Sequence, residues 1–550
     1  WEGKQLAFVT YATLITHATQ ASCVTLPQGL ADGTAPAVGN TPPFIDISRV
    51  RAHHGCMTDS PDAILNRILD AVPPKLFLGG EFRDASDGGT FEILDPATDT
   101  VLVEVASATE DDARAALDAA DAAQADWAAT PARERAEILR RVHELIIENT
   151  DELTNLQSLE MGRALPDSKG EVGYAAEFFR WFSEEAVRLR GDYRVSPDGS
   201  SRIITVRQPV GPALAITPWN FPLAMGARKI APALAAGCTI IAKPASKTPL
   251  SMLYLAKLMK DAGVPDGVVS VLPTGKSSNV SALLGDPRLR KFTFTGSTEV
   301  GQMLAAKAAE TSMKVSLELG GNAPFVVLED ADVDKAIAAI PSAKLRNGGQ
   351  VCIAPNRFIV HESLAEEFTA GVVKLFGDIT VGRGTDPDTK LGPLALRSQQ
   401  EKVVALVDDA VKNGGTVHIG GEIPELSDEL KDGYFYAPTV ITGFDPGADI
   451  VCEEIFGPVV AVTTVKSDEE AIEKANDTQY GLAAYVFSEN LTRALGAAEA
   501  IESGMVAVNK GKLSDPSAPF GGVKQSGVGR EGGFSGIDEF LEEKFITLEN

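Results

Sequence analysis

A cysteine between two arginines is the first feature of this sequence that could do chemistry. Cys352 lies in the stretch KLRNGGQVCIAPNRF, residues 344–358, directly after two glycines, a glutamine and a valine. A structural cysteine usually sits in an apolar run, whereas a reactive one needs a partly open, electropositive setting that lowers its thiol pKa. The residue types around Cys352 predict the reactive setting. Cys238 and Cys452, in contrast, are interpreted as small residues in apolar surroundings.

Polar segments follow several predicted strands and are the second chemical feature. They read TPWNFP (217–222), KPASKTP (243–249) and FTGSTEVG (294–301). Each is a turn rich in Gly, Pro, Ser or Thr between a strand and a helix, which is where open sheets bind ligands. Such turns need these residue types in any case, so none of the three is specific alone. No G-x-G-x-x-G stretch follows a strand, so the ordinary dinucleotide-binding turn is missing.

The elements that must position these residues alternate between strand and helix from Pro74 onward, which predicts an α/β fold with a largely parallel sheet. Thr109 and Asp112 resemble a capping box at the start of one helix. A long helical tract is predicted over 132–189 and a strand over 202–211. A second α/β region is predicted from about 323 to 520. The chain ends in the strand-like KFITLE, which could pair with another element or another subunit.

Size, charge and cysteine content exclude several classes of protein. A chain of 550 residues predicts two or three domains. The 76 acidic and 50 basic residues give a net charge of −26, which disfavours binding to nucleic acid or an anionic membrane. No apolar run reaches the roughly 18 residues of a membrane-spanning helix. The five cysteines have neither metal-ligand spacing nor a disulfide framework, so we expect no metal site and a reducing, cytoplasmic location.

The first 56 residues differ from the rest of the chain. They contain no methionine and end just where globular periodicity begins, and Met57 follows directly. We expect residues 1–56 to be an N-terminal extension, non-native or poorly ordered, with Met57 as a candidate start. The alternative is a signal peptide, because the apolar stretch LAFVTYATLITHATQAS follows Lys4.

Taken together, the motifs carry a resemblance to a known family. TPWNFP, KPAS, FTGSTEVG, LELGGNAP, GQVC, EEIFGP and PFGGVKQSG occur in the order and at the spacing found in the aldehyde dehydrogenase superfamily. The similarity covers about residues 71–550. It implies a variant Rossmann cofactor domain, an α/β catalytic domain and a β oligomerisation arm. The implied boundaries are 57–190 and 211–318 for the cofactor domain, 319–520 for the catalytic domain, and 191–210 with 531–550 for the arm.

The resemblance also implies a mechanism. Cys352 matches the nucleophile that attacks the aldehyde carbon to give a thiohemiacetal. The Asn220 side chain and the Cys352 backbone N–H match the donors to the oxyanion, and Glu318 matches the general base that activates water. The glycines before Cys352 would let the backbone approach cofactor and substrate closely. Without the family resemblance, Glu318 would be interpreted as a solvated surface carboxylate and Asn220 as a turn residue.

The cofactor prediction also follows from the resemblance. Lys243 resembles the ribose-binding lysine, and the remaining predicted cofactor-binding residues are Trp219, Gly296, Ser297, Glu454 and Phe456. Members that prefer NAD commonly have glutamate at position 246, where this chain has Ser246 followed by Lys247. A hydroxyl with nearby lysines would accept a 2′-phosphate, so we predict that NADP is preferred and NAD is also used. The alternative is that Lys247 simply faces solvent.

For the substrate, Arg228 and Arg346 match arginines that bind the distal carboxylate in succinate-semialdehyde dehydrogenases of this family, and Ser514 matches a serine with the same use. The resemblance therefore predicts oxidation of succinate semialdehyde, in 4-aminobutyrate degradation. Glutarate semialdehyde or another ω-carboxy aldehyde is the alternative substrate, because the loop around Ser514 differs from the sequence that is commonest in the family. A coenzyme A-acylating enzyme is disfavoured by Glu318, and a non-catalytic structural protein by the intact catalytic set. We expect a homodimer or homotetramer.

Overall fold

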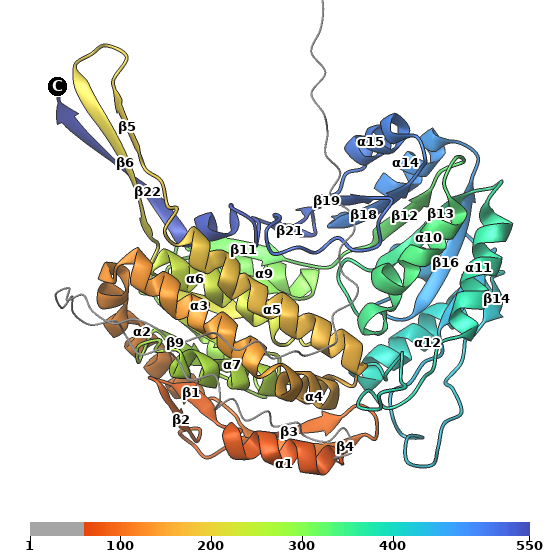
Figure 1. Ribbon diagram of the computed structural model, residues 1–550, viewed down its shortest axis with the longest axis horizontal. Coiled ribbons are helices and arrows are strands. Elements are labelled where there is room, and N and C mark those ends of the chain that lie inside the picture. The colour runs from red at the N-terminus through yellow and green to blue at the C-terminus, as the bar shows by residue number, and fades with distance from the viewer. Residues whose placement is uncertain (1–59) are drawn as a thin grey trace, which may run out of the picture. The chain divides into compact units, whose positions relative to one another are not determined.

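The computed structural model describes residues 60–550 of the chain (Figure 1). The predicted extension over 1–56, the candidate start at Met57 and the alternative of a signal peptide lie outside the described residues.

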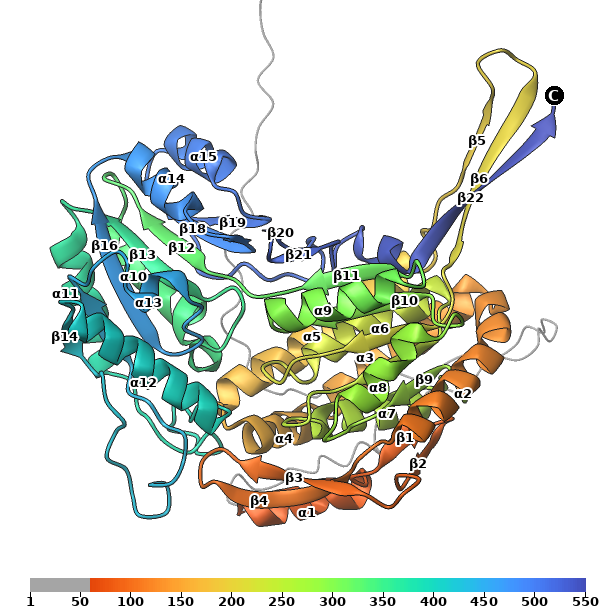
Figure 2. The ribbon, with the colours of Figure 1, turned by 180° about the vertical axis from the view of Figure 1, so that it is seen from behind.

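Strands between residues 76 and 318, together with β21 near the C-terminus, build an eight-stranded sheet, ordered β2-β1-β9-β8-β7-β10-β11-β21 (Figures 1 and 2). The run from β9 to β11 is parallel, whereas β1, β2 and β21 are antiparallel additions. The central strands are short apolar segments buried on both faces, as parallel sheets require. The strands are β1 (Leu76–Leu78), β2 (Glu81–Arg83), β7 (Ala213–Ile216), β8 (Ile240–Lys243), β9 (Val269–Val271), β10 (Lys291–Thr295), β11 (Lys314–Glu318) and β21 (Gly527–Val528).

Helices cover both faces of this sheet. Along β7, Ala213 and Ala215 pack into a core with α3, α5, α6 and α7, while Leu214 and Ile216 pack into a second core with α2 and α9. Side chains that alternate along a strand point to opposite faces, so one strand serves both cores. The helices are α2 (Glu110–Ala129), α3 (Ala132–Glu148), α4 (Thr150–Met161), α5 (Leu165–Glu185), α6 (Ala224–Ala236), α7 (Leu250–Asp261), α8 (Ser278–Ser281) and α9 (Thr298–Ala309), with α1 (Pro61–Ala71) and the hairpin β3 (Thr90–Asp95) and β4 (Thr100–Ala106) beside them.

Local signals in this region are partly confirmed. The capping box is present, since the Thr109 hydroxyl accepts the Asp112 N–H and the Asp112 carboxylate accepts the Thr109 N–H. The helical tract predicted over 132–189 is confirmed as helical, but it is divided into three helices, α3, α4 and α5. Gly162 ends α4 in the left-handed region at φ 85°, which favours glycine.

The second half of the chain builds a seven-stranded sheet, ordered β14-β15-β16-β13-β12-β18-β19. All pairs are parallel except β14 with β15. Its strands are β12 (Ala323–Val327), β13 (Pro355–His361), β14 (Thr416–Ile419), β15 (Thr439–Thr442), β16 (Val459–Val465), β18 (Ala483–Phe487) and β19 (Met505–Val508). Helices α10 (Val333–Ile340) and α11 (Ala365–Gly377) pack on one face, and α12 (Arg397–Lys412), α13 (Asp449–Cys452), α14 (Asp468–Asn476) and α15 (Leu491–Ala500) on the other. The domain boundaries given above stay a prediction.

A three-stranded antiparallel sheet projects from the first sheet (Figures 1 and 2). It consists of β5 (Asp192–Val195), β6 (Ser201–Pro209) and the C-terminal strand β22 (Leu541–Glu549). The predicted strands over 202–211 and in KFITLE are confirmed, and they pair with each other, Leu541 opposite Pro209 and Glu549 opposite Ser201. The short helix η5 (Gly536–Phe540) precedes β22 and packs against α6.

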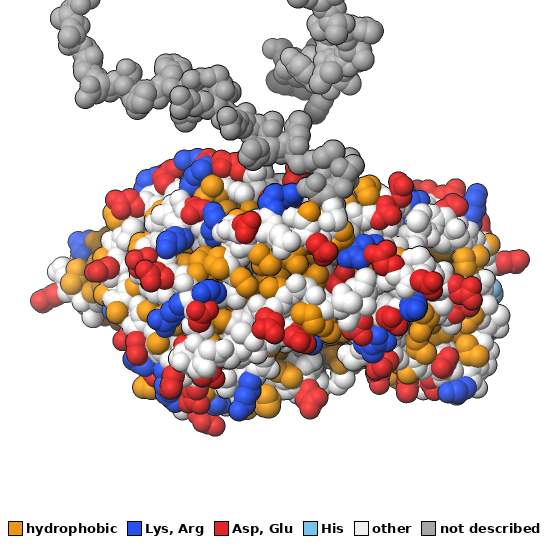
Figure 3. All heavy atoms as spheres, turned by 90° about the horizontal axis from the view of Figure 1, so that it is seen from below, with side chains coloured by type: hydrophobic (Ala, Val, Ile, Leu, Met, Phe, Trp, Pro, Cys, Tyr) orange, Lys and Arg blue, Asp and Glu red, His pale blue; other side chains and the backbone are white. Residues whose placement is uncertain are grey.

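Acidic and basic side chains are interspersed on the face seen in Figure 3, around a central group of hydrophobic side chains. Within residues 60–550, no helix has both the length and the apolar character that crossing a bilayer requires.

Candidate active site

The parallel register brings the predicted site segments to one edge of the first sheet. Ile216 at the end of β7 pairs with Lys243 at the end of β8, and Thr295 at the end of β10 pairs with Glu318 at the end of β11. Ile216 also pairs with Phe294. The segments that follow these strands therefore leave the sheet side by side, at the edge where open parallel sheets bind ligands.

A cavity of about 220 Å³ lies at this edge and contains most of the predicted residues. Its lining includes Trp219, Asn220, Arg228, Gly296, Ser297, Arg346, Cys352, Glu454, Phe456 and Ser514. Glu318, Lys243, Ser246 and Lys247 are not among the lining residues. Sequence reasoning missed Tyr174, Phe221, Met225, Gln399, Lys402 and Phe520, which also line it.

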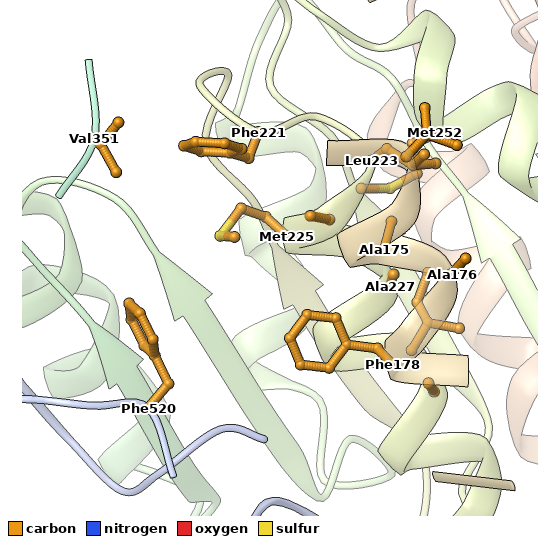
Figure 4. Close-up of a cluster of buried hydrophobic side chains, with 14 of the residues drawn as sticks. Ala175, Ala176, Phe178, Phe221, Leu223, Met225, Ala227, Met252, Val351 and Phe520 are labelled. Carbon is orange, nitrogen blue, oxygen red and sulfur yellow. The ribbon is translucent and has the colours of Figure 1, made fainter. Parts of the chain in front are cut away.

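Apolar side chains form much of the cavity wall. Phe221, Met225, Val351 and Phe520 face a common space from three separate segments of the chain (Figure 4). The signal that could have found these residues is their place in the quoted motifs. Phe221 lies within and Met225 just after the TPWNFP turn, and Phe520 lies in PFGGVKQSG. These side chains give the cavity a low-polarity surface, which strengthens any charge interaction inside it.

The turn before Cys352 has an unusual backbone. Asn347, Gly348 and Gly349 adopt successive left-handed conformations, with φ of 54°, 63° and 76°. A Cβ at Gly349 would lie 2.2 Å from the carbonyl oxygen of Gly457. Glycine at 349 therefore permits a close approach of the chain to itself, in addition to the predicted approach to cofactor and substrate. The positive φ values favour glycine at both 348 and 349.

The thiol of Cys352 does not have the lowered pKa that the neighbouring arginines suggested. Its pKa is raised to about 12, chiefly by burial and also by Glu454 and Glu318, against the lowering effects of Arg228 and Arg346. The prediction considered only the cations, whereas the fold also brings carboxylates to the thiol. The interpretation of Cys452 is also wrong, because it is exposed, while Cys238 is buried.

Asn220 is held close to the turn that carries Cys352. Its side-chain N–H donates to the carbonyl oxygen of Gln350 at 3.0 Å, while its own Oδ1 has no hydrogen-bond partner among residues 60–550. The amide can donate a second N–H, and the Cys352 backbone N–H makes no hydrogen bond within the same part of the chain. Two donors are thus available beside the thiol.

Glu318 is a buried carboxyl group rather than a surface one. It is 3% exposed, and neither of its oxygens has a hydrogen-bond partner within the described chain. Burial raises its pKa well above the ordinary value, and the neighbouring carboxylate of Glu531 raises it further. A raised pKa makes the ionised carboxylate a stronger base than that of an exposed glutamate, which suits a general base.

Glu531 is a site residue that sequence reasoning missed. It forms ion pairs with Lys229 and, at 2.5 Å, with Arg228. Burial opposes its ionisation, but Lys229 and Arg228 together hold its pKa below the ordinary value. The glycines around it, in the stretch GREGGF, are the only local signal. Arg228 therefore enters the cavity with its charge already paired, and its guanidinium lies 4.1 Å from the centre of the Phe520 ring.

Arg346 enters the cavity in a different state. Its guanidinium lies 5.4 Å from the centre of the Phe221 ring, and its Nε is buried without a hydrogen-bond partner in the described residues. Ser514 is 8% exposed and lines the same cavity. Arg346 and the Ser514 hydroxyl are the groups best able to receive an anionic part of a ligand.

The residues predicted for the cofactor surround the same sheet edge. Ser297 is the N-cap of α9, and its hydroxyl makes no capping hydrogen bond, so hydroxyl and helix N-terminus suit a phosphate. Lys243 is buried at the end of β8, and burial lowers its pKa to about 8. Ser246 is half-buried and Lys247 exposed. This donor set fits a dinucleotide phosphate and ribose.

Glu454 and Phe456 line the cavity together with Cys352 and the predicted cofactor-binding residues Trp219 and Ser297. The Phe456 ring packs edge-on against Trp219 with 5.4 Å between centroids. A Glu454 carboxylate oxygen accepts the Gly321 N–H at 3.4 Å, and burial raises the pKa of Glu454 to about 7. Among residues 60–550 no group of three or more His, Cys, Asp or Glu side chains could hold a metal ion.

Comparison with known proteins assigns the family. The model of the aldehyde dehydrogenase family matches residues 82–546, and the chain belongs to this family. It is 50% identical over 449 residues to a succinate-semialdehyde dehydrogenase of Paenarthrobacter nicotinovorans, covering 82% of this chain and 99% of the relative. It is 43% identical to a glutarate-semialdehyde dehydrogenase of Pseudomonas putida, covering 86% and 97%. A crystal structure of an E. coli NADP-dependent enzyme superimposes with a TM-score of 0.85 at 41% identity, covering 88% and 99%. The predicted family and its α/β fold are confirmed.

The raised pKa of Cys352 predicts how its alkylation depends on pH. Iodoacetamide reacts with the thiolate, so between pH 7 and 9 we expect the rate at Cys352 to rise about tenfold per pH unit. The rate is measured by mass spectrometry of the peptide that contains Cys352, with exposed Cys452 as an internal comparison. A plateau below pH 8 would contradict the raised pKa.

Proposed function

We propose that this protein oxidises succinate semialdehyde to succinate with NAD(P), through a cysteine thiohemiacetal and thioester. The observation that carries the proposal is that Arg346 and Ser514 line the same cavity as Cys352 and Asn220. An aldehyde with a carboxylate at its far end suits this arrangement, because a neutral aldehyde would leave the buried Nε of Arg346 unpaired. Its similarity to a succinate-semialdehyde dehydrogenase also supports the proposal.

In the proposed mechanism, Cys352 loses its proton and its sulfur adds to the aldehyde carbon. The second N–H of the Asn220 amide and the Cys352 backbone N–H stabilise the negative charge on the aldehyde oxygen. A nicotinamide, when bound, supplies the hydride acceptor. Glu318 takes a proton from a water molecule, which then attacks the thioester and releases the acid. Because Glu318 has a raised pKa, it can hold that proton until it passes to solvent.

The two arginines have unequal parts in this proposal. Arg228 is already paired with Glu531, so its main role is to shape the cavity and to donate a hydrogen bond. Arg346 is the residue that we propose pairs with the substrate carboxylate. Glutarate semialdehyde, longer by one methylene, is the second candidate, which the similarity to a glutarate-semialdehyde dehydrogenase supports.

Replacing Arg346 tests the substrate proposal. In Arg346→Ala we expect kcat/KM for succinate semialdehyde to fall about 10- to 100-fold, as loss of a charged hydrogen-bonding partner predicts. Absorbance of reduced nicotinamide gives the rate. Butanal is the matched neutral substrate, and its kcat/KM should change far less. Equal losses on both substrates would refute a carboxylate-binding role, and a faster wild-type reaction with glutarate semialdehyde would favour the second candidate.

NADP is proposed as the preferred cofactor, with NAD also used. The half-buried hydroxyl of Ser246 and the exposed ammonium of Lys247 suit a 2′-phosphate, and the similar E. coli structure is of an NADP-dependent enzyme. In Ser246→Glu, repulsion should lower kcat/KM for NADP at least about tenfold while leaving that for NAD much less affected. Lys247→Ala, which removes only the cation, should weaken NADP use without this repulsion. An unchanged NADP to NAD ratio in both variants would contradict the proposal.

We also propose that the protein is a homodimer or homotetramer. The three-stranded sheet carries exposed hydrophobic side chains, among them Tyr193, Phe545 and Leu548. Exposed apolar groups on a projecting sheet favour a partner surface. Light scattering should give the mass of two or four chains, and the mass of a single chain would contradict the proposal.

A cytoplasmic location and a place in 4-aminobutyrate degradation complete the proposal. Cys238, Cys352 and Cys452 are all free thiols, which supports a reducing compartment. Cell fractionation tests the location. The Cys352→Ala variant decides between a dehydrogenase and a non-catalytic structural protein. The dehydrogenase should lose its aldehyde oxidation in this variant, whereas a structural protein would show no oxidation that depends on Cys352.

A further inference from the structure

Asp167 is a carboxylate outside the cavity that contacts the catalytic turn directly. It lies in the first turn of α5, and its Oδ2 accepts the backbone N–H of Asn347 at 2.8 Å. The two residues are 180 positions apart in the sequence. Asp167 lies on a helix that packs against the first sheet, whereas Asn347 lies in the segment before β13 of the second sheet. This hydrogen bond is thus a tertiary link between α5 and the segment that leads to Cys352.

Asn347 is the residue through which this link could reach the chemistry. Its backbone is left-handed at φ 54° and ψ 32°, a conformation that costs free energy for a residue with a Cβ. Its side-chain N–H donates to the carbonyl oxygen of Asn220 at 2.9 Å and to that of Gln350 at 3.1 Å. The same Gln350 carbonyl accepts the Asn220 amide. A tilt of Asn347 would therefore move Asn220 and the turn together.

The charges around Asp167 agree with a fixed position. Arg163 and Arg346 are the cations that act on its carboxylate, and Arg163 also donates to the Asn220 carbonyl at 3.4 Å. Arg163 is itself paired with the buried Glu171, whose other oxygen accepts the N–H groups of Leu223 and Ala224 at the start of α6. The loop that carries Asn220 is thus held from both ends.

We propose that Asp167 is a positioning residue, which keeps the Asn220 amide aimed at the oxyanion by fixing the left-handed backbone of Asn347. The inference rests on the proposed roles of Cys352 and Asn220. If Asp167 only stabilised the fold, replacing it would lower the stability of the protein, and its effect on the reaction rate would not depend on whether Asn220 is present.

The test is a double-mutant cycle on an ester reaction that needs neither a semialdehyde nor a nicotinamide. With p-nitrophenyl acetate, the Cys352 thiolate adds to the carbonyl carbon, and the oxyanion collapses to expel p-nitrophenolate. The acetyl thioester left behind is then hydrolysed to acetate. The burst of p-nitrophenolate gives the acylation rate, which reports on the same oxyanion donors.

We expect Asn220→Ala to slow acylation about 100- to 1,000-fold and Asp167→Ala to slow it at least about tenfold. The double variant should be no slower than Asn220→Ala alone, because Asp167 acts through Asn220. Asp167→Asn, whose amide oxygen can accept the same N–H, should recover most of the loss. If Asp167→Ala does not fold, Asp167→Ser, whose hydroxyl is too short to reach Asn347, takes its place in the cycle.

Asp112→Ala is the matched control, since Asp112 is a buried carboxylate that accepts backbone N–H groups of Ser86 and Thr109 far along the chain from the catalytic turn. It should lower thermal stability and leave acylation unchanged. Additive losses in the double variant would overturn the inference while the proposed chemistry stands. Undiminished acylation in Cys352→Ala would refute the nucleophile and the inference with it.

Discussion

Backbone hydrogen bonds between the parallel strands β7, β8, β10 and β11 determine where every reacting segment leaves the first sheet. Because Ile216 pairs with Lys243 and Thr295 with Glu318, the ends of four strands lie in one row. The segments that carry Asn220, the predicted cofactor-binding residues and the buried Glu318 follow from that row. Cys352, the proposed nucleophile, lies just before β13 of the second sheet and lines the same cavity as Asn220.

The second constraint is the cost of burying charge. Arg228 is paired with Glu531, Arg163 with Glu171, and Arg346 is acted on by Asp167. Pairing lowers the cost of burial for Arg228 and Arg163, since an unpaired buried charge is strongly destabilising. Glu318 has no such partner within the described residues and has a raised pKa instead. The same physics therefore separates the groups that shape the cavity from the group that moves protons.

The hydrogen bonds around Asn347 join these two constraints. They connect α5, the loop after β7 and the turn before Cys352, which no sequence segment brings together. The left-handed backbone of Asn347 is held by this network, whereas Gly349 adopts its positive φ freely and, without a Cβ, leaves room for the carbonyl oxygen of Gly457. The position of the Asn220 amide beside the turn before Cys352 is thus a property of packing rather than of the TPWNFP turn alone.

Patterns with a local cause were predicted well from the sequence. The Thr109 and Asp112 capping box, the strands over 202–211 and at the C-terminus, and the βαβ alternation depend on neighbouring residues, and all are present. The helical tract over 132–189 is also present, but its division into three helices was not predicted, because its helical propensity hides the break at Gly162. The lowered thiol pKa was wrong for a different reason: burial raises the pKa of Cys352, and the carboxylates that oppose the arginines lie far from Cys352 in the sequence.

By itself, the sequence determined the family, the α/β class and the types of residue that do the chemistry, because these depend on motif identity and local periodicity. Only the tertiary structure decided how those residues behave. Burial raises the pKa of Cys352 and of Glu318. Glu531 forms an ion pair with Arg228, and Asp167 accepts a hydrogen bond from the turn before Cys352. Each of these effects depends on distance through space and on the exclusion of water, and neither quantity can be read from the order of residues along the chain.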